Sequence, residues 1–316
     1  MTNFLRTLFL LTFILSVKPA MAQDLAGLIE KGSLSDLKEA IKENPDLVNK
    51  QDSGGFTPLM YAAYANKLEI AKFLIDNKAN VNLTDNEQGT ALMLATYSNS
   101  LDIAKLLIDN KAEVNAQNKT GSSALMVAAT YNSAAVAKLL IEKGATVDTQ
   151  DNEGSTALII AVSYSNLDVV KILVENKADI NIKNKAGRTA LIISVSGLMV
   201  DTSADVSAML NVLLKDTTDV NVVDKDGWTP LMIATYSDRL ELMKLFIEKK
   251  ASLDAIENAG WTALMIAANF NYINAAKLLI ESGADATIKS NEDKKASDIA
   301  TTKEMKKILI EAEKTK

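Results

Sequence analysis

A segment of about 33 residues recurs along most of this 316-residue chain. Seven copies of one motif read TPLMYAAY, TALMLATY, SALMVAAT, TALIIAVS, TALIISVS, TPLMIATY and TALMIAAN, beginning at Thr57, Thr90, Ser123, Thr156, Thr189, Thr229 and Thr262. The intervals between them are 33, 33, 33, 33, 40 and 33 residues. A fixed period of this length is typical of repeat proteins, in which each copy is one supersecondary unit that buries its apolar face against its neighbours.

Each copy predicts a turn followed by two short helices. The turns DSGG, NKTG, DNEG, NKAG, DKDG and ENAG contain residues that favour turn dihedral angles. The motif Thr can cap the first helix, with Pro or Ala as its first residue. A second helix such as LDIAKLLIDN, from Leu101, carries a broad apolar face. A small residue recurs at one position of the first helix, at Ala62, Ala95, Ala128, Ala161, Ser194, Ala234 and Ala267.

These units resemble ankyrin repeats, whose usual pattern is D-x-x-G-x-TPLHxAA, a second helix and GADVN. The endings NKANVN, NKAEVN, KGATVD, NKADIN, TTDVN, KKASLD and SGADAT match the tail of that pattern. The resemblance implies an all-α fold, an α-solenoid of stacked helix-turn-helix repeats with β-hairpin fingers and capping units. It also implies that the first helices face a concave groove, and that the groove and finger tips hold a protein partner.

The first 22 residues are predicted to be a cleaved signal peptide. Arg6 precedes the apolar run LFLLTFILSV, and Ala20 and Ala22 form a small-residue cleavage pattern. A membrane anchor is the alternative, but a spanning helix needs about 20 apolar residues, and Lys18 and Pro19 interrupt this run. We therefore expect an exported bacterial protein that begins at Gln23, has no membrane attachment after cleavage and resides in the periplasm, with secretion as the alternative.

The remaining chain is predicted to contain three parts. Residues 23–53 form an N-terminal capping repeat, residues 54–291 form seven ankyrin repeats, and residues 292–316 form a C-terminal cap. Counting the cap as the first unit, the sixth unit has a seven-residue insertion near 196–206 that should enlarge the loop between its helices. The apolar residues Leu198, Met199 and Val200 leave open whether this insertion contacts a partner or is a tolerated surface loop.

Two further positions depart from the ankyrin pattern. The motif His is replaced by Met60, Met93, Met126, Ile159, Ile192, Met232 and Met265, and we expect these side chains to fill the core. The Gly that usually ends the second helix is Lys78, Lys111, Lys177 or Lys250 in four units. A non-glycine residue with positive φ costs about 1 kcal/mol there, so we expect less stability than an idealised array would have.

The composition argues against several classes of function. Histidine and cysteine are both absent, which excludes the usual zinc sites and the Ser-His-Asp and Cys-His catalytic devices. The acidic turns lack the spacing of a calcium loop, and no phosphate-binding glycine loop is present. The net charge is −6, and −8 without the first 22 residues, so a nucleic-acid partner is not expected. We predict a non-enzymatic protein without a cofactor or a metal.

Aromatic residues are concentrated at two positions of the repeat. Phe56, Trp228 and Trp261 directly precede the motif Thr, and Tyr64, Tyr97, Tyr131, Tyr164, Tyr236 and Phe270 follow it by seven or eight residues. Aromatic rings dominate interface hot spots, so these nine residues are the predicted protein-binding set. Trp228 and Tyr236 have no evident part in the packing of their own repeat. Local packing is the alternative, because the offset of the Tyr residues changes from seven to eight.

The predicted function is that of an exported scaffold, expected to be a monomer, that binds a protein partner through its groove and finger tips. A carbohydrate stacked on the same rings is a further possible ligand. The alternatives are a structural or self-associating component of the cell envelope and a secreted effector that binds a host protein. An enzyme is the least favoured reading, because no carboxylate can be nominated as a catalytic group.

Overall fold

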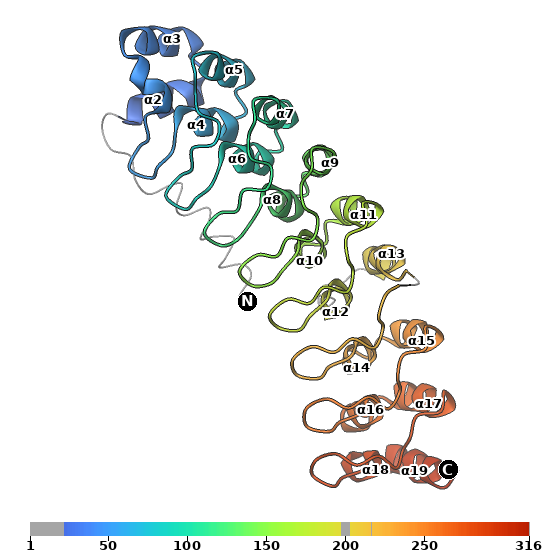
Figure 1. Ribbon diagram of the computed structural model, residues 1–316. Helices are drawn as coiled ribbons and strands as arrows, with labels where there is room; N and C mark the ends of the chain where they lie inside the picture. Colours follow the sequence, from blue (N-terminus) through green and yellow to red (C-terminus); the bar gives the residue numbers. More distant parts are fainter. Residues whose placement is uncertain (1–21, 197–202, 216, 316) are drawn as a thin grey trace. The chain divides into compact units, whose positions relative to one another are not determined.

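The computed structural model describes residues 22–196, 203–215 and 217–315, and over these residues the fold is all-α (Figure 1). The chain divides into two compact units, Met1–Asn152 and Glu153–Lys316. Most of the predicted signal peptide and the residues Leu198, Met199 and Val200 lie outside the described residues. Among the residues that are described, no helix is long and apolar enough to cross a membrane.

Each unit is built from consecutive helix pairs. Unit 1 contains α2 (Ala22–Lys31), α3 (Leu34–Glu43), the 3-10 helix η1 (Pro45–Asn49), α4 (Pro58–Tyr64), α5 (Leu68–Asp76), α6 (Ala91–Tyr97), α7 (Leu101–Asp109), α8 (Ala124–Tyr131) and α9 (Ala134–Glu142). Unit 2 contains α10 (Ala157–Ser163), α11 (Leu167–Glu175), α12 (Ala190–Ser196), α13 (Ser203–Leu213), α14 (Pro230–Tyr236), α15 (Leu240–Glu248), α16 (Ala263–Phe270), α17 (Ile273–Glu281), α18 (Ala296–Ile299) and α19 (Lys303–Glu313).

The first helix of each pair is called the inner helix, the second the outer helix, and the loop that precedes an inner helix a finger. Within each unit, Figure 1 shows the inner helices in one row beside the fingers and the outer helices in a second row. The fold of each unit is therefore an α-solenoid of stacked helix pairs, as predicted.

The motif Thr starts each inner helix, which confirms the predicted N-caps. The Oγ1 of Thr57 accepts a hydrogen bond from the backbone N–H of Met60 at 3.2 Å. The same bond, at 3.2 or 3.3 Å, forms at Thr90, Ser123, Thr156, Thr189, Thr229 and Thr262. All seven residues are buried, and an N-cap of this kind stabilises a helix by about 1 kcal/mol.

The residues between the inner and outer helices turn the chain through a left-handed conformation. Nine residues after the cap, φ is 52° at Asn66, 49° at Asn99, 53° at Asn132, 58° at Ser165, 48° at Asp238 and 60° at Asn271. Asn and Asp tolerate this conformation better than other non-glycine residues. The sequence thus places the left-handed turn after each of these inner helices at one fixed position in the repeat.

The core lies between the helix pairs, and the repeated small and sulfur-containing residues form it. Ala62, Ala95, Ala128, Ala161, Ser194, Ala234 and Ala267 are buried, as are the Met and Ile residues at the position of the family's His. The sulfur of Met60 also accepts the backbone N–H of Thr57 at 3.4 Å. The prediction that these side chains fill the core is confirmed.

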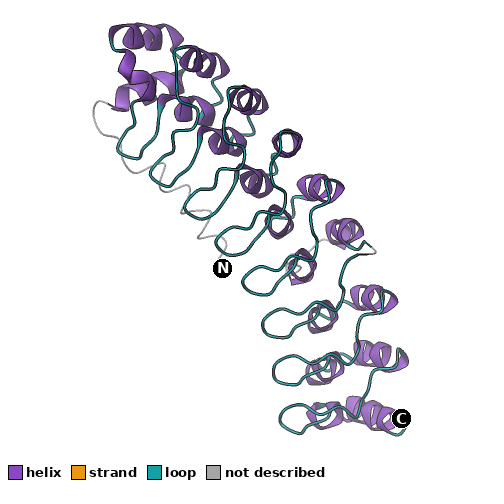
Figure 2. Ribbon diagram, in the orientation of Figure 1, coloured by secondary structure: helices purple, strands orange, loops and turns teal. Residues whose placement is uncertain are grey.

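The fingers are tight loops closed by backbone hydrogen bonds. In the first finger, the N–H of Asp52 donates to the oxygen of Phe56 at 3.1 Å, and the N–H of Gly55 donates to the oxygen of Asp52 at 3.0 Å. Figure 2 shows helices and loops, and the described residues contain no strand, only two isolated antiparallel bridges, Thr84 to Thr90 and Gln117 to Ser123. The fingers therefore have hairpin-like pairing that is too short to form a strand.

Neighbouring fingers are joined by backbone and Asn side-chain bonds. Asn86 donates its backbone N–H to Gly54 and its side-chain amide to Ser53, at 2.9 and 2.8 Å. This approach requires glycine at position 55, where φ is 81° and an added Cβ would lie 2.6 Å from the backbone nitrogen of Asn86. The fingers can therefore stack only where that position has no side chain or where the neighbouring finger shifts.

Four repeat tails are tied to the next repeat by a second set of Asn side chains. The amide of Asn82 donates to the carbonyl of Lys111 at 3.0 Å, and its Oδ1 accepts the N–H of Glu113 at 2.9 Å. Asn49, Asn115 and Asn181 make the same pair of bonds. These bonds explain why the VN ending recurs in the sequence.

The predicted lysines in left-handed conformation are confirmed. The φ angles are 72° at Lys78, 70° at Lys111, 64° at Lys177 and 63° at Lys250. Gln88, in the finger DNEQG, is a further non-glycine residue in this conformation, with φ of 61°. Gln88 occupies the position at which the other repeat fingers have Gly.

The seven extra residues of the long repeat are distributed over three places. Six residues separate α12 from α13, against three between α4 and α5. The outer helix α13 has 11 residues where α5 has 9, and the loop from α13 to Thr229 is two residues longer than the loop from α5 to Thr90. Three of the seven extra residues therefore fall between α12 and α13, two fall within α13 and two fall between α13 and Thr229.

Candidate functional site

Aromatic rings from successive inner helices meet in two rows, one in each unit. The N-terminal row consists of Tyr64, Tyr97 and Tyr131. The ring centroids of Tyr64 and Tyr97 lie 5.6 Å apart in a stacked arrangement, and those of Tyr97 and Tyr131 lie 4.5 Å apart at 69°. All three residues are half-buried. These tyrosines thus pack against one another within the repeat array, and part of each side chain remains accessible to solvent.

The C-terminal row consists of Trp228, Tyr236, Phe270 and Tyr272. The centroid of Tyr236 lies 5.6 Å from that of Trp228 and 5.1 Å from that of Phe270, with both pairs at 89°. Phe270 stacks on Tyr272 at 5.6 Å. Tyr236 and Phe270 are each 43% exposed, so this row presents more ring surface to solvent than the N-terminal row does.

The two rows bring together six of the nine predicted residues. Phe56, Tyr164 and Trp261 are not members. Phe56 packs on Tyr61, with centroids 5.6 Å apart, and Tyr164 is 40% exposed at the C-cap of α10. Trp261 is half-buried against the core of unit 2. The nine predicted residues therefore differ in their exposure and in their ring contacts, and they are not equivalent.

The expectation that Trp228 takes no part in the packing of its repeat is wrong. Trp228 and Trp261 are both partly buried and pack against the apolar core of unit 2. An indole is large enough to cover the end of the core and still present one edge to solvent. Tyr236 behaves as predicted in one respect, because it remains exposed.

Sequence reasoning missed two aromatic residues that contact predicted ones, namely Tyr61 beside Phe56 and Tyr272 beside Phe270. Tyr61 stands four residues after Thr57, at a position where the other repeats have Leu94, Val127 or Ile. Its hydroxyl donates to Asp52 Oδ2 at 2.6 Å. Tyr272 stands two residues after Phe270, and this spacing could have indicated a ring contact across the turn.

The local environment raises the pKa of two tyrosines of unit 1, Tyr61 and Tyr64. Burial, followed by the hydrogen bond to Asp52, raises the pKa of Tyr61. Burial also raises the pKa of Tyr64, with smaller contributions from Tyr97 and Glu30. These hydroxyls are therefore hydrogen-bonding groups at neutral pH and not nucleophiles or bases.

In each unit, the inner helices supply a face without charge. None of the seven inner helices that follow a motif Thr or Ser, α4, α6, α8, α10, α12, α14 and α16, contains Asp, Glu, Lys or Arg. The outer helices carry the charges instead, for example Glu69 and Lys72 on α5, joined at 2.9 Å. Interface cores are depleted of charged residues, so the inner helices have the composition of a binding surface.

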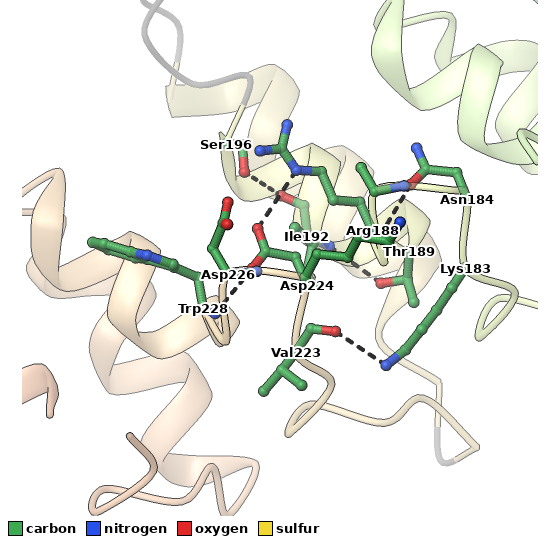
Figure 3. Close-up of polar contacts among 12 residues, drawn as sticks. Lys183, Asn184, Arg188, Thr189, Ile192, Ser196, Val223, Asp224, Asp226 and Trp228 are labelled. Atoms are coloured by element: carbon green, nitrogen blue, oxygen red, sulfur yellow. Dashed lines mark hydrogen bonds and ion pairs between the residues drawn. The ribbon is translucent and has the colours of Figure 1, made fainter. Parts of the chain in front are cut away.

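An ion pair between two fingers lies beside the C-terminal row. Figure 3 shows Arg188 on one finger reaching Asp224 on the next, with Trp228 beside them. The Nε of Arg188 lies 3.5 Å from Asp224 Oδ2, and Asp224 Oδ1 accepts the backbone N–H of Asp226 and of Trp228, each at 3.0 Å. Asp224 is buried, so this pair fixes the finger that carries Trp228.

The described residues contain no group of three or more His, Cys, Asp or Glu side chains that could hold a metal ion. Each row by itself offers ring faces and hydroxyls, which suit recognition of another molecule. The absence of His and Cys from the sequence removes the commonest catalytic groups.

Comparison with known proteins identifies the family. A family model described as ankyrin repeats (3 copies) matches residues 25–118, 112–184 and 198–290. These ranges cover most of the chain, and the chain therefore belongs to the ankyrin repeat family. Ankyrin repeats serve as scaffolds for protein–protein interaction and are generally not enzymes.

Individual relatives match only short segments. The chain is 38% identical over 52 residues to ankyrin repeat domain-containing protein 49 of Drosophila melanogaster and 41% identical over 49 residues to the DNA-binding protein RFXANK of Homo sapiens. Each match covers 16% of this chain, and the chain spans only 24% and 19% of those two proteins.

One solved structure shares the fold over a larger part of the chain. The crystal structure of the ankyrin repeat domain of Bcl-3, described as a unique member of the IkappaB protein family, matches with a TM-score of 0.63 and 24% identity. The match covers 71% of this chain and 100% of that domain. At this identity the likeness shows the fold alone.

Proposed function

We propose that this protein is an exported, non-enzymatic scaffold that binds a protein partner through its inner helices and fingers. The observation that carries the proposal is that each unit places a row of aromatic rings beside inner helices that have no charged residue. Tyr and Trp lose little rotamer entropy on contact and provide both apolar area and a polar group. A protein surface can bury such rings and satisfy their hydroxyls.

Affinity capture with a pair of exposed-ring variants tests this proposal. In Tyr236→Ser and Phe270→Ser, the new residue is one that the repeat already uses at the equivalent position, at Ser163 and at Ser98. The double variant should therefore fold, which circular dichroism can verify. Mature wild-type protein should capture a partner from the envelope extract of its own cells, and the double variant should not.

The matched control replaces an exposed apolar residue away from this face. Leu101 is 41% exposed at the start of the outer helix α7, so Leu101→Ser should leave capture unchanged. Equal capture by the double variant and the wild type would place the binding surface elsewhere. Loss of capture with the Leu101 variant would show that the assay reports general surface hydrophobicity.

Export is a separate part of the proposal and rests on the sequence of residues 1–22. The apolar run after Arg6 and the small residues Ala20 and Ala22 favour cleavage before Gln23. Mass spectrometry of the protein purified from its own cells should give a mature chain that begins at Gln23. A chain that retains Arg6 and Lys18 and occurs only with cytoplasmic markers would contradict export without affecting the proposed binding face.

A further inference from the structure

The outer helix α19 of unit 2 exposes a row of lysines. Spacings of four, three and four residues separate Lys303, Lys307, Ile310 and Lys314, and such spacings place side chains on one side of a helix. One open hollow of about 330 Å³ on this side is lined by Lys303, Lys306, Lys307, Ile310, Glu311 and Lys314. We call the surface formed by these six residues the lysine face.

The opposite side of α19 belongs to the core. Met305 and Leu309 are buried in the apolar core of unit 2, and α19 packs on α17 and α18 (Figure 1). Glu313 is held at the start of α18, where its Oε2 lies 2.8 Å from the Nζ of Lys295. The lysine face is therefore the exposed side of a helix whose orientation is fixed by packing.

The lysines of this face have little charge compensation within the protein. Lys307 Nζ lies 4.0 Å from Glu311 Oε1, and the two side chains are 77% and 64% exposed, so their attraction is weak. Within the described part of the chain, no ion pair involves Lys303, Lys306 or Lys314.

The charges next to the lysine face do not neutralise it. The lysines that precede α19, namely Lys289, Lys294 and Lys295, each pair with a carboxylate at 2.7 or 2.8 Å. Glu304 is exposed on α19 but does not line the hollow, and α17 has one charge of each sign, Lys277 and Glu281. The hollow itself therefore has four positive charges against the single carboxylate of Glu311.

Solubility alone does not account for this excess. The outer helix of the first pair, α3, is also highly charged, and it exposes both signs together: Asp36, Lys38, Glu39, Lys42 and Glu43. A surface of mixed sign keeps a protein in solution. The whole chain has a net charge of −6, so the lysine face is a local reversal of sign.

The charge of the face selects an anionic partner, because complementary potentials favour association. Charges more than about 8 Å away are largely screened at physiological salt. The lysines beside the hollow, and not the net negative charge of the chain, therefore decide what binds at this surface.

A membrane with anionic lipids suits this face less well than an acidic protein segment does. A helix that lies on a membrane buries its apolar side among the lipids, but the apolar side of α19 packs in the core. Ile310, 37% exposed, is the one apolar side chain that lines the hollow, and Glu311 would repel lipid phosphates. An acidic segment can place carboxylates beside the lysines and an apolar side chain on Ile310.

We propose that the lysine face docks a short acidic segment of a separate protein. Lys303 and Lys314 are eleven residues apart, which is about 16 Å along a helix, and an extended segment of about five residues spans that distance. The segment presents carboxylates to the lysines and one apolar side chain to Ile310. The face is separate from the inner helices and fingers, so the proposal goes beyond the proposed function and does not depend on it.

Differential selection of random peptides displayed on phage tests this proposal. The folded chain is the target, and peptides that bind elsewhere are removed with the lysine-face variant, which combines Lys303→Gln, Lys306→Gln, Lys307→Gln and Lys314→Gln. The retained peptides should be rich in Asp and Glu, with an apolar residue among them. Their dissociation constants should rise at least about fivefold between about 50 and 500 mM NaCl, since salt screens exposed charges.

The matched control removes four lysines from equivalent exposed positions of other outer helices, with Lys72→Gln, Lys105→Gln, Lys138→Gln and Lys171→Gln. It changes the net charge by the same amount and should bind the selected peptides like the wild type, whereas the lysine-face variant should bind at least about tenfold more weakly. Gln is a good helix former, so both variants should fold, which circular dichroism verifies. Ile310→Gln should weaken binding about threefold or more.

The other outcomes overturn the proposal. An equal loss of binding in the control variant would show that the peptides respond to the net charge of the chain. Retained peptides without carboxylates, or no retained peptide, would exclude an acidic segment. Flotation with vesicles of phosphatidylglycerol and phosphatidylcholine, or self-association in sedimentation velocity, would assign the face to a membrane or to a second copy if the lysine-face variant lost it and no acidic peptide bound. Capture through Tyr236 and Phe270 is unaffected by any of these results.

Discussion

The rings of Tyr97 and Tyr131 lie 4.5 Å apart, with an interplanar angle of 69°, although the two residues occupy different positions in their repeats. Tyr97 follows Thr90 by seven residues, and Tyr131 follows Ser123 by eight. Both residues are the last of an inner helix, and the left-handed residue follows two positions later at Asn99 and one position later at Asn132. The change of offset therefore does not separate the rings, and it is not an argument against a common surface.

This contact predicts energetic coupling between the two residues. Tyr97→Ala and Tyr131→Ala should each lower the free energy of unfolding, and the double variant should lower it by about 1 kcal/mol less than the sum of the two, as for other aromatic pairs. Urea denaturation followed by circular dichroism measures the cycle. Strict additivity would show that the rings do not interact in solution.

The positive φ angles of four lysines predict that replacing such a lysine by glycine stabilises the protein. Lys78→Gly should raise the free energy of unfolding by up to about 1 kcal/mol, because Gly adopts positive φ without a Cβ penalty. The control is Lys72→Gly in the interior of α5, which should lower stability by about 1 kcal/mol. A loss of stability in both variants would mean that the strain at Lys78 is already offset, for example by the helix dipole.

Finger stacking predicts a large difference between two glycines with similar backbone angles. At Gly121, φ is 77° and an added Cβ would lie 2.7 Å from the backbone nitrogen of Asn152, whereas Gly144 has φ of 89° and nothing within 4 Å. Gly121→Ala should cost about 2 to 3 kcal/mol from strain and overlap together, and Gly144→Ala about 1 kcal/mol from strain alone. Equal costs would contradict close packing of the fingers.

The environment of Asp85 predicts that Asp and Asn at this position give different stabilities, and that the difference depends on pH. Burial raises the pKa of Asp85, despite the hydrogen bonds that its carboxylate accepts from Gly89 and Glu87. The folded state therefore binds this proton more tightly than the unfolded state does. The stability associated with the group is present below its ordinary pKa and is lost as the pH rises through the raised value.

Asp85→Asn should accordingly stabilise the protein at pH 7. Asn118 occupies the same position in the next repeat, and its Oδ1 accepts the corresponding backbone bonds, so the amide preserves the turn. The advantage of the variant over the wild type should shrink as the pH falls from 7 towards 4, measured by thermal unfolding. An advantage that is constant with pH would exclude the raised pKa as its cause.

The repeat made most of the fold predictable from the sequence. The period located seven caps at Thr or Ser, seven buried small residues and four strained lysines, because each is a local requirement of one repeated unit. The distribution of the insertion over three places was not predictable, because helix length after an insertion depends on packing between α11, α12 and α13.

The positions of the aromatic residues in the candidate site were predictable from the sequence, but the contacts that join their rings into rows were not. The sequence identified rings at two places in the repeat, and the structure joins Tyr64, Tyr97 and Tyr131 into one row and Trp228, Tyr236 and Phe270 into another. The sequence alone could not show that the indole of Trp228 packs against the core, because burial depends on neighbours from other repeats. The pairing of Arg188 with Asp224 likewise joins residues 36 positions apart.

Site-specific photo-crosslinking tests the central claim most directly, namely that the inner helices and fingers are the binding surface. A photoreactive phenylalanine analogue would replace Tyr236, which is 43% exposed on the C-terminal row, or Lys244 on the outer helix α15. In the producing cells, irradiation should give a crosslinked partner from position 236 and none from position 244. A crosslink from position 244 alone would contradict the account.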